Sequence, residues 1–176
     1  MTDDIANGAQ APLADMTEGQ AQFMVEKIYV KDLSFEVPGA PGIFNADGEN
    51  NLGMNMQHQI TAISETAFEV VLHLTLNCQQ GESTVYLAEV KQAGVFTLTG
   101  FDQQGVEYLL STQAPTVLYP YARQIISDLI QSGGFPPFLL QPINFEGLYM
   151  DAMRQREMES QGDLAADSGE PRHLDS

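Results

Sequence analysis

The apolar residues of this chain change their spacing near residue 100, and no single type of secondary structure accommodates both spacings. Before residue 100, four segments alternate apolar and polar side chains with a period of two, which is typical of a strand with one buried face. These segments are Phe23–Val37, Leu52–Ala62, Phe68–Cys78 and Ser83–Leu98. Strands followed by helices indicate an α+β domain. We predict a four-stranded antiparallel sheet followed by helices packed on one face.

The alternation also predicts which side chains of each strand share a face. The apolar face of the first strand is expected to carry Phe23, Val25, Tyr29, Leu33, Phe35 and Val37. Its other face is expected to carry Glu26, Asp32, Ser34 and Glu36. In the second strand Leu52, Met54 and Met56 fall on the apolar side, and in the third Cys78 does so, opposite His73. Cys78 is therefore expected to be a buried, inert thiol.

In the second half of the chain, the spacing of apolar residues predicts helices separated by breaks. Val106–Leu110 forms one or two helical turns that end before Pro115, because the residue before a proline disfavours the helical conformation. A second helix is predicted over Thr116–Ser132, with Pro120 either beginning it or kinking it. Gly133 and Gly134 end it.

The connector Phe135–Ile143 contains three prolines, which exclude both a helix and a central strand. Asn144 is the expected N-cap of a last helix, Phe145–Met158. The connector is rich in apolar side chains, and the chain has eight methionines. Two interpretations remain open: these side chains fill the protein's own core, or they form a groove for apolar or extended segments of variable sequence.

Residues 1–22 contain four acids and no base, and residues 154–176 combine acids and arginines with Gly, Ser and Pro. Neither segment has an apolar face to bury, so both are predicted to be disordered tails. The chain then consists of one domain, 23–153, between an acidic N-terminal tail and a C-terminal tail. We find no internal repeat.

Seven Lys and Arg against 24 Asp and Glu give the chain a net charge of −17. Such a surface repels phosphate backbones and anionic membranes, so neither a nucleic acid nor direct membrane insertion is expected. No apolar run approaches the ~20 residues of a spanning helix. The N-terminus lacks the pattern of a secretory signal, and a single cysteine suits a reducing compartment. These features predict a cytoplasmic protein.

The sequence offers no chemistry typical of an enzyme. Its three histidines are widely separated, and it lacks zinc-binding, phosphate-binding and nucleophile-elbow motifs. We therefore expect no catalytic residues, metal or cofactor.

Four runs of residues, in order along the chain, carry a family resemblance. They are Ile28 to Pro38 (IYVKDLSFEVP), Phe68 to Leu72 (FEVVL), Leu87 to Phe96 (LAEVKQAGVF) and the block from Pro115 to Met150, which includes LYPYAR, GFP and PINF. Together they resemble the SecB family of bacterial protein-export chaperones over nearly all of 23–153. Both tails depart from the family pattern.

The resemblance implies an ATP-independent holdase that binds unfolded precursors of secreted proteins and passes them to the SecA motor ATPase. It also implies a homotetramer built as a dimer of dimers. By resemblance, the docking surface for the basic, zinc-bearing end of SecA corresponds to Asp32, Glu36, Leu87 and Glu89. The groove for clients corresponds to Leu52, Met54, Met56, Phe135, Phe138, Leu140, Tyr149 and Met153. The alternative is an adaptor of the same fold that serves one particular partner, such as a toxin or its antitoxin.

Overall fold

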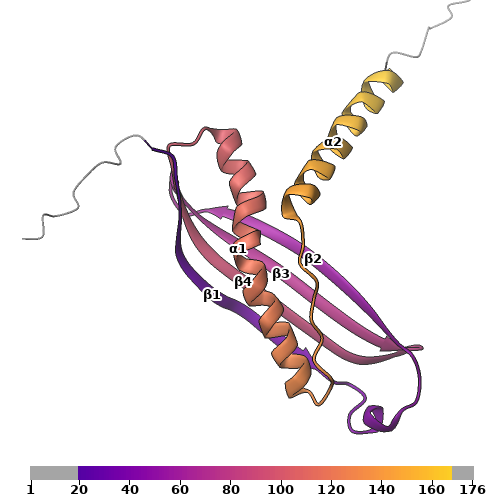
Figure 1. Cartoon of the computed structure of the whole chain (residues 1–176). Helices are drawn as coiled ribbons and strands as arrows, with labels where there is room; N and C mark the ends of the chain where they lie inside the picture. Colours follow the sequence, from indigo (N-terminus) through magenta and orange to yellow (C-terminus); the bar gives the residue numbers. More distant parts are fainter. Residues whose placement is uncertain (1–19, 168–176) are drawn as a thin grey trace, which may run out of the picture.

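The computed structural model describes residues 20–167 of the chain (Figure 1). Four long strands are followed by two helices: β1 (Gln22–Glu36), β2 (Asn50–Ala62), β3 (Ala67–Gln80), β4 (Ser83–Thr99), α1 (Gln103–Ser132) and α2 (Phe145–Asp167). A short 3-10 helix, Gly42–Asn45, lies between β1 and β2. Of the predicted tails, 1–22 and 154–176, only residues 20–22 and 154–167 are among the described residues.

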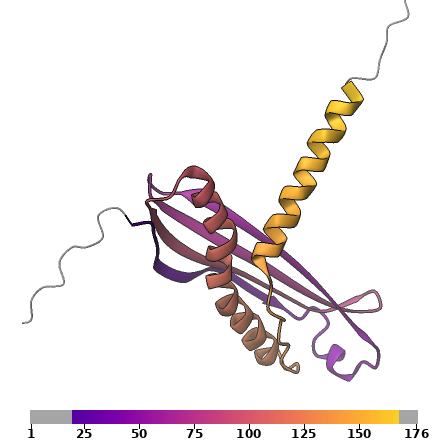
Figure 2. The same cartoon turned by 45° about the horizontal axis from the view of Figure 1, so that its top comes forward.

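The strands form one antiparallel sheet in the order β1-β4-β3-β2, which confirms the predicted fold class. α1 lies across one face of this sheet, and the connector that follows it runs back alongside β2 (Figures 1 and 2). The core lies between α1 and the sheet. Its fully buried members include Leu72 and Leu74 of β3, Phe96 of β4, and Leu118 and Ile126 of α1. We call this side of the sheet the core face and the opposite side the polar face.

The faces of β2 and β3 follow the predicted alternation, but β1 does not. Its register against β4 shifts at two β-bulges, between Val25 and Lys27 and between Val30 and Asp32. Each bulge inserts one residue and exchanges the two faces. The middle of the strand is therefore inverted: Ile28 packs on the core, and Tyr29, predicted to be apolar-facing, hydrogen-bonds Glu69 on the polar face. Leu33 was expected to be buried, but it is 46% exposed because β1 is the edge strand.

The predicted break before Pro115 is wrong, because α1 is one helix that contains both Pro115 and Pro120. Each proline removes a single backbone hydrogen bond, and burial of the surrounding apolar face outweighs that loss. Pro115 is itself buried. The helix begins at Asp102, whose carboxylate accepts a hydrogen bond from the Gly105 amide at 2.8 Å. It ends at Gly133 and Gly134, as predicted; Gly134 has a φ of 88°, which a side chain would strain.

The connector has no regular structure, as predicted, and a hydrogen bond of 2.6 Å from the Tyr119 hydroxyl to the Gln141 carbonyl ties it to α1. Asn144 caps α2 through a 3.0 Å bond from the Gly147 amide. α2 continues to Asp167, beyond its predicted end at Met158. Residues 154–167 of the expected C-terminal tail are thus helical, since good helix formers dominate after Met150 and no proline occurs before Pro171.

Cys78 is 1% exposed, and this burial raises the pKa of its thiol, in agreement with the expectation of an unreactive side chain. None of the helices in the described part of the chain is both long and apolar enough to cross a membrane.

Candidate binding surfaces

The polar face of the sheet brings together the four residues predicted to form a docking surface. Pairing of β1 with β4 sets Asp32 opposite Lys91, Ser34 opposite Glu89 and Glu36 opposite Leu87. Partners in an antiparallel pair point to the same side of a sheet, and residues two apart on one strand do so too. Asp32, Glu36, Leu87 and Glu89 therefore share the polar face, over two adjacent strands. We call these four residues the acidic surface.

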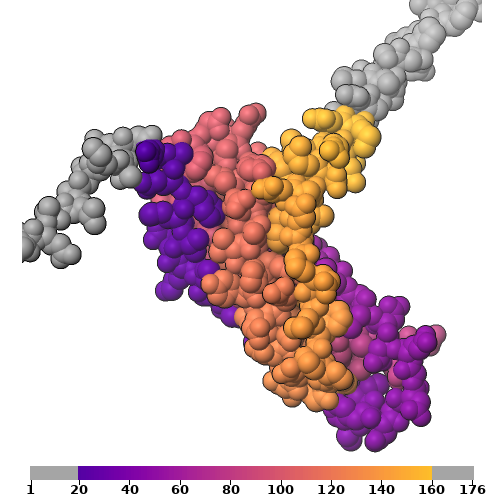
Figure 3. Space-filling view, viewed as in Figure 1, coloured from indigo at the N-terminus to yellow at the C-terminus, as the bar shows by residue number. Residues whose placement is uncertain are grey.

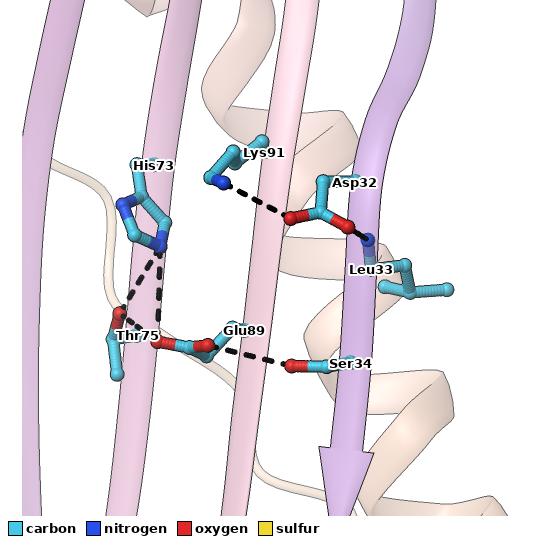
Figure 4. Close-up of polar contacts among 7 residues, drawn as sticks. All are labelled: Asp32, Leu33, Ser34, His73, Thr75, Glu89 and Lys91. Atoms are coloured by element: carbon cyan, nitrogen blue, oxygen red, sulfur yellow. Dashed lines mark hydrogen bonds and ion pairs between the residues drawn. The ribbon is translucent and has the colours of Figure 1, made fainter.

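Hydrogen bonds and ion pairs hold two of its carboxylates in place (Figure 4). Lys91 Nζ lies 3.0 Å from Asp32 Oδ2, and this contact is the main reason why the pKa of Asp32 is lowered. Thr75 Oγ1 donates to Glu89 Oε1 at 3.1 Å, and Ser34 Oγ lies 3.4 Å from Glu89 Oε2. Nε2 of His73 lies 3.8 Å from Glu89 Oε1. The surface thus presents fixed negative charges around one apolar side chain, Leu87.

The partners of the neighbouring polar residues were not anticipated from the sequence. Lys31 Nζ lies 2.7 Å from Glu69 Oε2, and the Tyr29 hydroxyl donates to the other oxygen of the same carboxylate. These two bonds lower the pKa of Glu69 and remove it as a free negative charge. The alternation of Glu69 and His73 on β3 indicated their face, but their partners depend on the register between strands. Only the structure supplies that register.

On the core face, four hollows follow one another along β2. Their residues from β2 are, in order, Asn50, then Leu52 and Met54, then Met56, and finally Ile60. At about 3.3 Å per residue, this row is about 33 Å long. The connector and α2 supply the other wall of the first three hollows, and the start of α1 supplies that of the hollow at Ile60. Figure 3 shows the connector at the surface beside β2. We call this row of hollows the groove.

The predicted client-binding residues all line the groove, but in three separate hollows. Leu52, Met54, Phe138 and Leu140 line a hollow of about 360 Å³. Met56, Tyr149 and Met153 line the next one, of about 160 Å³. Phe135 lines a third hollow of about 260 Å³ and packs against Phe44 and Tyr86, with ring centroids 5.3 and 5.0 Å apart.

These residues differ in how much surface they offer. Leu140 is only 6% exposed and belongs to the core, so it supports the wall of the groove from beneath. Its neighbour Leu139 is 67% exposed and lines the same hollow as Met54, which is 47% exposed. Leu148, 50% exposed, lines the hollow of Tyr149. The predicted client-binding set did not include Leu139, Leu148 or any residue of the hollow at Ile60, which has a volume of about 460 Å³ and walls that include Phe68, Phe101 and Val106.

Comparison with known proteins agrees with this architecture. Residues 16–156 match the family described as "Preprotein translocase subunit SecB". Protein-export protein SecB of Stenotrophomonas maltophilia is 58% identical, over 96% of both chains. That of Xanthomonas euvesicatoria is 54% identical over the same shares. Among solved structures, a SecB-like chaperone of Mycobacterium tuberculosis, in complex with a peptide from an antitoxin, has the same fold. Its TM-score is 0.58 at 21% identity, covering 69% of this chain and 90% of its own. The chain described here therefore belongs to the SecB family.

Proposed function

We propose that this protein is an ATP-independent holdase that binds unfolded precursor proteins in the groove and delivers them to SecA through the acidic surface. Membership of the SecB family makes it an export chaperone and not an enzyme. The observation that carries the finer proposal is the row of hollows along β2, three of which are mainly apolar, whereas the one at Asn50 is mainly polar. We propose no catalytic residue or cofactor, and a cytoplasmic location.

The groove suits clients of variable sequence. Unfolded chains share apolar side chains and a backbone that extends by about 3.3 Å per residue, so about ten residues fit along 33 Å. Affinity then comes from burial of apolar surface, at about 25 cal/mol per Å² before the cost of ordering. Met54, Met56 and Met153 are flexible and polarizable, so they adapt to different client side chains.

The acidic surface suits a cationic partner. Its carboxylates lie on the face of the sheet opposite to the groove, so SecA and a client can bind at the same time. Negative charges on an open surface speed the encounter with a basic segment, and Leu87 offers an apolar contact once the segment has docked. The net charge of −17 strengthens the steering and argues against a nucleic-acid partner or membrane insertion.

A holdase is expected to suppress the aggregation of several unrelated unfolded proteins at a near-stoichiometric ratio, without ATP. Light scattering by chemically denatured clients diluted into buffer measures this. The alternative is an adaptor dedicated to one partner. The antitoxin peptide bound to the Mycobacterium tuberculosis SecB-like protein is an observation in favour of this alternative. Suppression confined to a single client would favour that alternative over the holdase.

We further propose that the protein is a homotetramer, arranged as a dimer of dimers. Along the edge strand β1, Val25, Val30 and Leu33 are 43–46% exposed although they point to the core face. Tyr121 on α1 is 51% exposed as well. An exposed, apolar edge strand favours pairing with a second copy.

The mass in solution tests this assembly. Multi-angle light scattering at micromolar concentration is expected to give about 77 kDa, four times the 19.3 kDa of one chain. A mass of 19.3 kDa that persists as the concentration rises would contradict the tetramer.

A further inference from the structure

Lys91 lies at one end of the acidic surface, directly beside Asp32. On the polar face of the sheet it stands in register between Asp32 on β1 and His73 on β3, two residues along β4 from Glu89. Its ammonium group lies 3.0 Å from Asp32 Oδ2, and it lowers the pKa of that carboxyl. The chain has only seven Lys and Arg, so a lysine at this position is a specific feature of the surface and not part of a general excess of bases.

Of the two carboxylates of the acidic surface that have hydrogen-bond partners, Glu89 is held differently from Asp32. Glu89 accepts a hydrogen bond from the Thr75 hydroxyl, and the Ser34 hydroxyl and His73 Nε2 lie 3.4 and 3.8 Å from its oxygens. None of these groups is a permanent cation, so they orient the carboxylate without the fixed positive charge that Lys91 brings to Asp32. Asp32 is held by a full positive charge, which cancels much of its field. A cationic group of a partner can pair with Glu89 directly. To pair with Asp32, it must first displace Lys91.

The structure offers Lys91 a second position. Its side chain borders a hollow of about 110 Å³ on the side away from Asp32, also lined by Gln57, Gln59 and His73. The amide oxygens of two glutamines are acceptors for an ammonium group. Both members of the ion pair are partly exposed, with 43% and 61% of their side-chain surface accessible, so the pair is weak enough to exchange.

We propose that Lys91 is an internal counter-ion that competes with a cationic partner for Asp32 and thereby limits the affinity of the acidic surface. This inference rests on the proposed function, because the partner in question is the basic segment of SecA. When the partner binds, its cation replaces Lys91 at Asp32, and the released ammonium turns toward the glutamines. Lys91 then keeps the complex weak enough to dissociate after delivery of a client.

The test is Lys91→Gln in the full-length protein, with binding to SecA measured by isothermal titration calorimetry at two salt concentrations. Removal of the competitor is expected to tighten binding by about two- to fivefold, the range typical of an exposed ion pair. Binding should also fall more steeply with salt. Lys31→Gln is the matched control: it makes the same change in net charge but frees Glu69, outside the acidic surface, and is expected to change the affinity less.

A double-variant cycle separates competition at Asp32 from a general charge effect. In an Asp32→Asn background, Lys91→Gln is expected to lose most of its gain, because the contested carboxylate is already neutral. Unchanged or weaker binding by Lys91→Gln in the wild-type background would overturn the inference, since Lys91 would then be a spectator or a direct contact. A gain of equal size in both backgrounds would overturn it too.

A readout without SecA keeps this inference distinct from the docking proposal. The carboxyl carbon of Asp32, followed by NMR during acid titration, is expected to show a higher pKa in Lys91→Gln than in the wild type. If the pKa does not move, Lys91 is not the counter-ion, whatever SecA does. If it rises but wild-type protein fails to bind SecA, the docking proposal fails, and the competition is then measured with a short polylysine peptide. Tighter binding of that peptide by Lys91→Gln supports the inference, and unchanged or weaker binding overturns it.

Discussion

Met54→Asp combined with Leu139→Asp is expected to weaken suppression of aggregation by at least about tenfold, while the fold and the assembly persist. Both side chains line the same hollow of the groove, from opposite walls. They are 47% and 67% exposed, so the free protein loses little packing when they change. A bound client would have to strip water from two carboxylates instead of covering two apolar groups, and about 1.4 kcal/mol of lost affinity already corresponds to tenfold.

The control for this pair is Ile63→Asp combined with Met158→Asp. These residues are 58% and 65% exposed and lie outside the four hollows of the groove, so they add the same charge at comparable cost to folding. The control is expected to hold clients as the wild type does. Equal activity of the groove variant and the control, at unchanged mass, would contradict the assignment of the groove. Phe138→Asp is a poorer test, because that ring packs against the core and its loss would also report on folding.

Alternation was enough to predict the faces of β2 and β3, because these two strands pair without a shift over the segments predicted for them. It failed for the middle of β1. There the apolar residues are consistent with either face of the strand pointing to the core, so the sequence does not reveal the bulge. Tyr29 illustrates this, because an aromatic ring suits a core as well as a hydrogen bond to Glu69. Asp32 and Glu36 were placed correctly because both follow the second bulge.

The groove shows a different limit of sequence reasoning. Its walls come from β2 and from the connector, more than 70 residues apart, and composition indicates that both are apolar without saying which side chains stay free. Leu139 and Leu140 are adjacent and identical in type, yet one is 67% and the other 6% exposed. That difference depends on how the connector lies over the sheet. The prolines exclude regular structure there but do not fix the path.

Asp32→Lys combined with Glu89→Lys is expected to reduce SecA binding by more than about tenfold and to leave client holding near the wild-type level. Each reversal removes an attraction for a basic segment and adds a repulsion. At Asp32 the new lysine also faces Lys91, so two like charges meet on adjacent strands. The groove proposed for clients lies on the opposite face of the sheet, and neither residue lines any of its four hollows.

Glu26→Lys combined with Glu159→Lys is the matched control, because it changes the net charge equally at two exposed positions outside the acidic surface. Steering by net charge alone predicts the same loss of affinity for both pairs, whereas a defined docking site predicts that the control retains most of the binding. The wild-type interaction should weaken as salt rises, since the charges involved are exposed. Binding that is insensitive to salt would instead point to Leu87 and its apolar surroundings as the main contact. Loss of both activities in the reversed pair would mean that the two faces of the sheet are not independent.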